Sequence, residues 1–162
     1  MSTITIAVAS DLSGFPLKNE VVAHLRAKEG IEVMDLGIES EDKPKPYCEQ
    51  APLVARAIQE GRADRGILIC GTGQGMAIVA NKFKGIYACV VTDTFSAERS
   101  RIINNANVIT MGGWITAPFF GKEMVDAWLG VAFTEKMEFK ADFLTNAFNQ
   151  VQALEEENFK AS

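Results

Sequence analysis

Short apolar runs alternate along the chain with longer stretches in which apolar residues recur every three or four positions. The runs are continuous, which is typical of strands that are covered on both faces in a parallel sheet. The longer stretches have the spacing of amphipathic helices. The predicted strands are 4–9, 31–36, 66–70, 86–91 and 108–111, and the predicted helices are 16–29, 49–61, 74–82, 94–104 and 118–130.

This alternation predicts an α/β domain, a three-layer Rossmann-like fold with an open parallel five-stranded sheet and right-handed crossovers. Pro16 and Pro118 suit the first turns of their helices, and Gly30 and Gly61 suit helix stops. A further helical stretch, at about 138–159, follows a unit that is already complete. This extra C-terminal helix either closes a face of its own domain or lies across a partner subunit.

Length and composition indicate one globular domain over residues 1–162, in the cytoplasm. The 162 residues are 48% apolar and 23% charged, which excludes disorder. The net charge of -5 argues against nucleic acid, and neither a signal peptide nor a membrane span is expected. Three cysteines without a CxxC pair, together with a single histidine, favour neither a disulfide framework nor a metal site.

Ligands of open α/β sheets bind beyond the carboxyl ends of the strands, so a site is expected in the segments that follow the strands. All five of these segments contain polar residues or glycine. They are Ser10 and Asp11, Lys45 to Tyr47, Cys70 to Gly75, Thr92 and Asp93, and Gly112 to Trp114.

The strongest signal is the segment ILICGTGQGM at 67–76, where a strand leads into a loop with alternate glycines and then into a helix. Such a loop turns backbone N–H groups toward a ligand, and the helix start adds partial positive charge suited to an oxyanion or phosphate. Met76 stands where the dinucleotide fingerprint needs glycine, and the Gly-Lys-Ser/Thr of a P-loop is absent. Neither nucleotide motif therefore fits, and a tight structural turn is the alternative.

Cys70 lies where this strand ends, facing amides that favour a thiolate, and is a candidate catalytic residue. Cys89, in mid-strand, is expected to be a buried apolar residue. Asp11 is either a helix cap or a site residue, whereas capping is favoured for Asp93. Asn104 ends a predicted helix as either a stop or an oxyanion donor.

Three segments carry a resemblance to a known family: ICGTGQGMAIVANK at 69–82, FSAERSR at 95–101 and NNANVITMG at 104–112. With Ser10-Asp11 before them and MVDAWLG at 124–130 after them, they resemble the ribose-5-phosphate isomerase B / galactose-6-phosphate isomerase family. The resemblance implies a homodimer or homotetramer with active sites between subunits, which the C-terminal helix reaches. It also implies aldose–ketose isomerisation of a small sugar phosphate through a cis-enediol, with neither metal nor organic cofactor.

Transferred to this sequence, the family's site makes Cys70 the base that moves a proton between C1 and C2. Loop amides, with Thr72 and Asn104, would hold the enediolate oxygen, and Asp11 would contact the sugar hydroxyls. The other expected substrate-binding residues are Gly71, Gly73, Gln74, Gly75, Ser10, Lys45, Tyr47, Trp114 and Lys140.

The sequence departs from the family at five positions. Leu12 and Ile103 replace common histidines, the second of which is used for ring opening, and Trp114 replaces an arginine. The two C-terminal arginines that grip phosphate correspond to Phe139 and Phe143. Aromatic rings cannot copy bidentate arginine donors, so the family's phosphate grip is lost.

Two explanations of these departures follow. Either other cations hold the phosphate, from Lys45, Lys82, Lys140 or Arg101, or the substrate is not a pentose or hexose phosphate. A four-carbon sugar phosphate cannot close a furanose ring and needs no ring opening, which favours a tetrose or tetrulose phosphate. The alternatives are one subunit of a hetero-oligomeric isomerase of the galactose-6-phosphate type, a non-catalytic sugar-binding homologue, and a flavodoxin-like nucleotide module.

Overall fold

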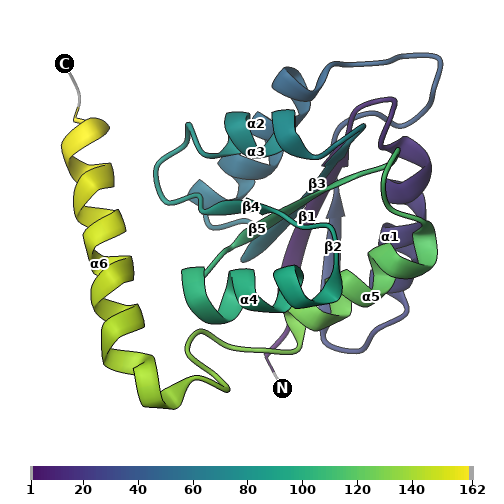
Figure 1. Cartoon of the computed structure of the whole chain (residues 1–162). Coiled ribbons are helices and arrows are strands. Elements are labelled where there is room, and N and C mark those ends of the chain that lie inside the picture. The colour runs from purple at the N-terminus through teal and green to yellow at the C-terminus, as the bar shows by residue number, and fades with distance from the viewer. Residues whose placement is uncertain (1, 161–162) are drawn as a thin grey trace.

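A computed structural model describes residues 2–160, and it contains a parallel five-stranded sheet between two layers of helices (Figure 1). The strands are β1 (Ile4–Ser10), β2 (Ile31–Asp35), β3 (Arg65–Cys70), β4 (Ala88–Val90) and β5 (Val108–Gly112). The helices are α1 (Phe15–Arg26), α2 (Tyr47–Gln59), α3 (Gln74–Ala80), α4 (Thr94–Asn104), α5 (Pro118–Leu129) and α6 (Ala141–Asn158), the last preceded by a 3-10 turn, η1 (Glu138–Lys140). The predicted α/β fold and its extra C-terminal helix are confirmed.

The strand order β2-β1-β3-β5-β4 reverses direction between β1 and β3. Parallel open sheets bind ligands at such a switch point, outside the carboxyl ends of the strands. The pairing register sets Ser10 of β1 opposite Ile69 of β3, so Asp11, which follows β1, lies beside Cys70, the last residue of β3. The topology therefore places two of the predicted site residues at the switch point.

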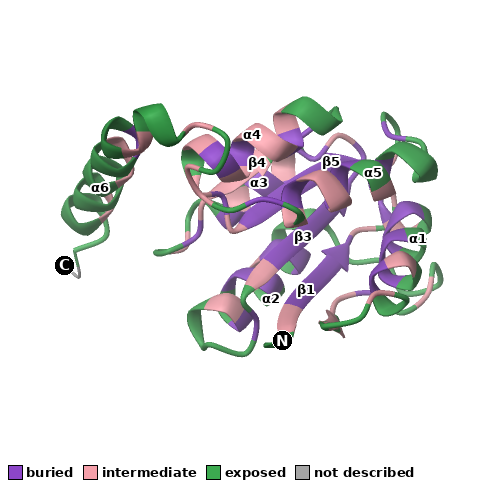
Figure 2. Cartoon of the chain, turned by 90° about the horizontal axis from the view of Figure 1, so that it is seen from below, coloured by how far each residue is buried: buried purple, intermediate pink, exposed green. Residues whose placement is uncertain are grey.

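Each face of the sheet has its own apolar core. Helices α1, α4 and α5 cover one face, where Ile6, Ile67 and Trp128 are fully buried. Helices α2 and α3 cover the other face and carry many alanines, which let them lie close to Ala7 and Leu68. The central strands β1, β3 and β5 are buried almost throughout, as continuous apolar runs predict for a sheet covered on both sides (Figure 2). The edge strands β2 and β4 are only partly buried.

Most element boundaries agree with the periodicity, and the differences have local causes. The strand expected at 86–91 is confined to Ala88–Val90, because the Tyr87 N–H donates to the Asn107 side-chain oxygen (2.8 Å) instead of to a strand. The helix expected to reach residue 82 ends at Ala80, because the Asn81 side chain bonds both backbone groups of Ala88, at 2.8 and 2.9 Å. Hydrogen bonds from side chains to the backbone thus determine where β4 begins and where α3 ends.

Helix α6 stands beside the β4 edge and covers neither face of the sheet (Figures 1 and 2). Tyr87 anchors it, with its ring 5.0 Å from that of Phe148 and its hydroxyl donating to Glu155 (2.8 Å). Burial, followed by the bond to Glu155, raises the pKa of Tyr87 to about 12. Four large apolar side chains of the η1–α6 segment stay exposed: Phe139, Phe143, Val151 and Leu154. Among residues 2–160, no helix combines the length and apolarity needed to cross a membrane.

A buried cation ties α1 to the end of β2. The Lys18 side chain is 2% exposed, and its Nζ donates to Asp35 (2.8 Å) and to the Ile38 carbonyl (3.0 Å). Its partner Asp35 is 29% exposed and keeps some contact with water. Loss of the partner therefore leaves Lys18 as a buried unpaired charge, whereas Asp35 would still be in contact with water.

We expect Asp35→Ala to lower the free energy of unfolding by about 2 kcal/mol, because it leaves the Lys18 ammonium buried without its counter-charge. Lys18→Met should cost less, because the Asp35 carboxylate that it leaves behind still reaches water. Urea denaturation of the two variants measures the difference. Equal losses would mean that burial of Lys18 does not govern this pair.

Candidate active site

The loop between β3 and α3 places the Cys70 thiol beneath a turn of backbone amides. Gly73 has a φ of +79°, in the left-handed region that favours glycine, and this turns its N–H back toward the strand end. That N–H donates to the Cys70 Sγ over 3.1 Å, and the Thr110 hydroxyl donates to the Gly73 carbonyl over 2.8 Å. The loop thus places a backbone N–H donor directly against the sulfur.

Three backbone segments meet at this point because glycines leave room for them. A Cβ on Gly112 would lie 2.6 Å from the Gly71 carbonyl oxygen, and one on Gly113 would lie 2.4 Å from the Ser13 oxygen. A Cβ on Gly14 would lie 2.3 Å from the Ile69 oxygen. These distances are shorter than side chains tolerate, so the ends of β1, β3 and β5 touch only as bare backbone.

Above the thiol lies a hollow of about 340 Å³, referred to below as the Cys70 hollow. It brings together residues from the ends of β1, β3 and β5 and from the starts of α2 and α3. Its lining is Asp11, Ser13, Tyr47, Cys70, Gly71, Thr72, Gln74, Gly75, Ile78 and Trp114. Most of the predicted site residues therefore share one surface.

Asp11 is fixed at the edge of the Cys70 hollow by the turn that precedes α1. Its Oδ1 accepts from the Gly14 N–H over 3.1 Å, so the side chain holds the turn while Gly14 itself takes the N-cap position. Burial raises the pKa of Asp11 above its ordinary value, and the N–H groups of Gly14 and Ser13 act in the opposite direction. The carboxyl group thus combines a structural bond with a place at the site.

Four predicted substrate-binding residues lie outside this lining: Gly73, Ser10, Lys45 and Lys140. Ser10 is fully buried at the end of β1, and its hydroxyl oxygen has no hydrogen-bond partner within residues 2–160. Lys45 is exposed on the loop before α2 and pairs with Glu49 over 3.6 Å. Neither side chain lines the Cys70 hollow.

Comparisons with known proteins show the family of the chain. The family model for Ribose/Galactose Isomerase matches residues 6–142, most of the chain. The chain belongs to this isomerase family. It is 49% identical over 156 residues to a 4-deoxy-4-sulfo-D-erythrose isomerase of Clostridium sp., covering 96% of this chain and 98% of the relative.

Other members are similar over less of their sequence. A D-erythrulose-4-phosphate isomerase of Pectobacterium atrosepticum is 42% identical and the ribose-5-phosphate isomerase B of Escherichia coli 45% identical, covering 80% and 79% of this chain and 85% of each relative. Among solved structures, ribose-5-phosphate isomerase B of Clostridium thermocellum superimposes with a TM-score of 0.86 at 33% identity, covering 96% of this chain and 99% of the other. The expected family and fold are thereby confirmed.

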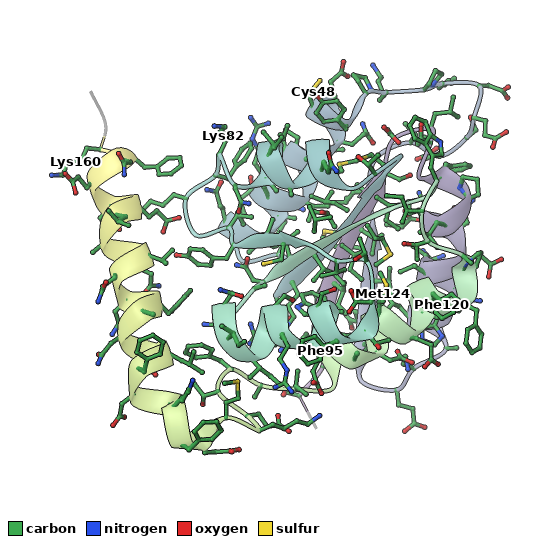
Figure 3. All side chains as sticks on the ribbon, in the orientation of Figure 1. Cys48, Lys82, Phe95, Phe120, Met124 and Lys160 are labelled. Carbon is green, nitrogen blue, oxygen red and sulfur yellow. The ribbon has the colours of Figure 1, made fainter. Side chains whose placement is uncertain are left out.

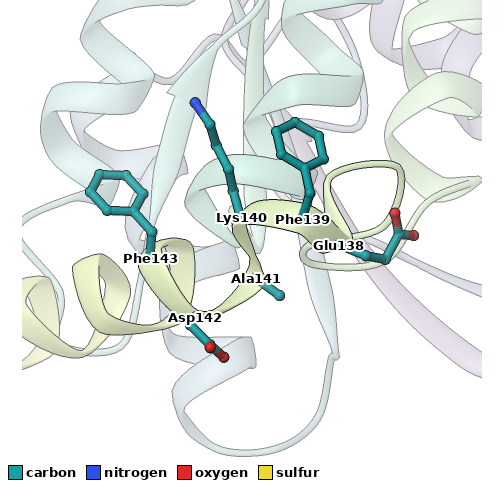
Figure 4. A pocket seen from close by; sticks show the side chains of 6 residues that line it. All are labelled: Glu138, Phe139, Lys140, Ala141, Asp142 and Phe143. Atoms are coloured by element: carbon teal, nitrogen blue, oxygen red, sulfur yellow. The ribbon is translucent and has the colours of Figure 1, made fainter.

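Two predicted residues of the isomerase site lie away from the Cys70 hollow within one chain. Asn104 lines a second hollow of about 380 Å³, between β4, α4 and α6, referred to below as the α6 hollow. Lys140 lies at the start of α6, where its side chain points to the same side as those of Phe139 and Phe143, while Asp142 points away (Figure 4). One chain by itself does not unite these side chains with Cys70.

Three other predictions concern residues next to the site. Asp93 is the N-cap of α4, accepts from the Ser96 N–H over 2.7 Å and forms a capping box, as expected. Cys89 packs against the core but is only partly buried, and burial raises the pKa of its thiol. Within residues 2–160, no group of three or more His, Cys, Asp or Glu side chains is placed to hold a metal ion.

Sequence reasoning missed two residues of the lining. Ser13 follows the first strand in the same turn as Asp11, and this position was the available signal. Ile78 is 63% exposed on α3, although an apolar residue in a helical pattern is normally assigned to the core. Only the three-dimensional placement of α3 shows that Ile78 faces the site.

Gly112→Ala should disturb the site, because its new Cβ meets the Gly71 carbonyl, a backbone atom that cannot rotate away. We expect a loss of about 2 kcal/mol in the free energy of unfolding, together with a loss of activity. Gly121→Ala is the matched control, since its Cβ would meet a flexible Leu17 methyl at 3.0 Å. Urea denaturation and an isomerase assay measure both, and equal behaviour would contradict the close-approach argument.

Proposed function

We propose that this protein is an aldose–ketose isomerase of a four-carbon sugar with a terminal sulfonate, interconverting 4-deoxy-4-sulfo-D-erythrose and the corresponding 2-ketose. The observation that carries the proposal is the likeness, over nearly the full length of both chains, to the 4-deoxy-4-sulfo-D-erythrose isomerase. The D-erythrulose-4-phosphate isomerase among the relatives supports a four-carbon chain independently.

The chain length agrees with the residues that depart from the family. In a four-carbon sugar whose C4 carries the anionic group, no hydroxyl remains at C4 to close a furanose ring. The substrate is then open-chain, and its isomerase needs no group that opens a ring. Ile103, which stands where the family commonly has a ring-opening histidine, fits such a substrate.

The terminal anion agrees with the scarcity of cations. A sulfonate has one negative charge, whereas a phosphate monoester carries about -1.5 to -2 at neutral pH. A site for the smaller charge needs fewer cationic donors. Phe139 and Phe143 flank Lys140 on one side of the η1–α6 segment, and this single cation suits a sulfonate better than a phosphate dianion (Figure 4).

Cys70 is the base in the proposed reaction. Its thiolate takes the proton from C2 of the aldose, the C2–H electron pair forms the C1=C2 bond, and O1 receives a proton. The proton then returns from Sγ to C1, and O2 gives up the proton that balances the one gained by O1. Thr72 and the loop amides stabilise the enediolate oxygen, while Asp11 holds the substrate hydroxyls.

The same proposal makes the active site shared between two copies in a homodimer, or in a homotetramer built from such dimers. Asn104 and Lys140 do not line the Cys70 hollow of their own chain, because each lines a different hollow. The exposed apolar side chains of the η1–α6 segment supply the kind of surface that a second copy would bury. A partner's Asn104 and Lys140 would then meet Cys70 across the interface.

The activity prediction uses the purified protein alone. We expect turnover of 4-deoxy-4-sulfo-D-erythrose, slower turnover of D-erythrulose 4-phosphate, and loss of at least about 100-fold in kcat with Cys70→Ala, because the base is removed. Alkylation of Cys70 should abolish the activity. Cys48 is exposed at the start of α2, so the alkylation is carried out in Cys48→Ser protein (Figure 3).

Each other result points to a different conclusion. Activity that survives complete alkylation of Cys70 would exclude the thiol as base. Preference for ribose 5-phosphate would exclude the four-carbon assignment. Sugar binding without turnover would indicate a binding homologue, and activity that appears only with a second, different chain would indicate a hetero-oligomer.

Subunit mixing tests the shared site. Cys70→Ala and Asn104→Ala homodimers should each be nearly inactive, whereas a mixed dimer keeps one site with both native residues. Random exchange should therefore restore about a quarter of the wild-type activity. No recovery in a mixture that light scattering shows to be dimeric would mean that both residues act within one chain.

A further inference from the structure

The indole of Trp114 lies directly on the first glycine of the catalytic loop. A Cβ built on Gly71 would stand 2.7 to 2.8 Å from three atoms of the six-membered ring, Cε3, Cδ2 and Cζ3. The ring is thus in contact with the residue that follows Cys70, and it forms one wall of the Cys70 hollow. No other residue type at position 71 would leave the ring in this place.

Backbone hydrogen bonds fix where this wall stands. The Trp114 N–H donates to the Gly71 carbonyl over 3.0 Å, and the Gly113 N–H donates to the Cys70 carbonyl over 2.7 Å. These bonds do not involve the indole, so the loop keeps its anchors when the ring is truncated. The side chain is 76% exposed, and its removal opens no hole in the core.

A second aromatic ring covers the start of α3. A Cβ on Gly75, the second residue of α3, would lie 2.8 Å from Tyr47 Cε2 and 2.9 Å from Cδ2, so the Tyr47 ring lies on this glycine as Trp114 lies on Gly71. The hollow over Cys70 and Thr72 therefore has an aromatic wall at Gly71 and another at Gly75.

We propose that Trp114 is the residue that determines substrate chain length, because its indole closes the Cys70 hollow one residue away from the base. This inference rests on the proposed function and identifies the residue that selects a four-carbon substrate. The ring is uncharged, so it acts by occupying volume and not by binding the anion. A sugar with one more carbon would have to place its terminal group where the indole lies.

The test compares Trp114→Ala with Phe120→Ala, a control that removes another exposed ring, on α5, without touching the hollow (Figure 3). kcat/KM is measured for 4-deoxy-4-sulfo-D-erythrose and for ribose 5-phosphate. We expect Trp114→Ala to raise the ratio of the five-carbon to the four-carbon substrate by about tenfold or more, mainly through KM. Phe120→Ala should leave this ratio unchanged.

The outcomes separate this inference from the proposed function. Wild-type protein that fails to turn over any four-carbon sugar contradicts the proposed function, whatever Trp114 does. Four-carbon turnover in the wild type with an unchanged ratio in Trp114→Ala overturns the inference alone. A uniform loss on both substrates also overturns it, because a ring that merely supports the loop would lower both equally.

Fluorescence gives a readout that does not depend on turnover. The chain has two tryptophans, and Trp128 is fully buried, so acrylamide quenching reports mainly on Trp114. We expect 4-deoxy-4-sulfoerythritol, a polyol that cannot isomerise, to protect Trp114 from quenching, and ribitol 5-phosphate to protect it at least about tenfold less effectively. Equal protection by both polyols would overturn the proposed selectivity.

Discussion

The site depends on three backbone segments that touch without intervening side chains. At the switch point of the sheet, the turn after β1 contacts the end of β3 at Gly14, and the segment after β5 contacts that turn at Gly113. The end of β5 contacts the loop after β3 at Gly112. Any Cβ at these positions would separate the segments. The relative positions of Asp11, Cys70 and Trp114 therefore depend on glycines, which lack the Cβ atoms that would push these segments apart.

The same loop explains how the site can act on an anionic intermediate with few formal charges. Its donors are backbone amides and a hydroxyl, and the Gly73 N–H already points at the Cys70 sulfur. Preorganised neutral donors stabilise developing negative charge without having to reorganise during the reaction. The uncharged rings of Tyr47 and Trp114 form walls of the Cys70 hollow, and the hydrogen-bond donors come from the loop.

Helix α6, unlike the other helices, does not pack on a face of the sheet. The two faces of the sheet are already covered, so α6 is held at the β4 edge by Tyr87, Phe148 and Glu155. Leu144 of α6 is buried, whereas Phe143, Val151 and Leu154 stay exposed. Several exposed large apolar residues on one helix are typical of a surface that meets another chain. This arrangement agrees with the proposed site shared between subunits.

The sequence alone determined the five strands, the helices between them and the loop at 67–76, because buried strands, amphipathic helices and alternate glycines each leave a local pattern. It also placed Asp11 and Cys70 at strand ends. Only the tertiary structure showed that Ile78 and Ser13 join them, and that Asn104 and Lys140 do not within one chain. The contact of the Trp114 ring with Gly71 was likewise visible only in the tertiary structure. Contacts between residues distant in sequence depend on strand order and on room left by glycines, and neither leaves a periodic signal in the chain.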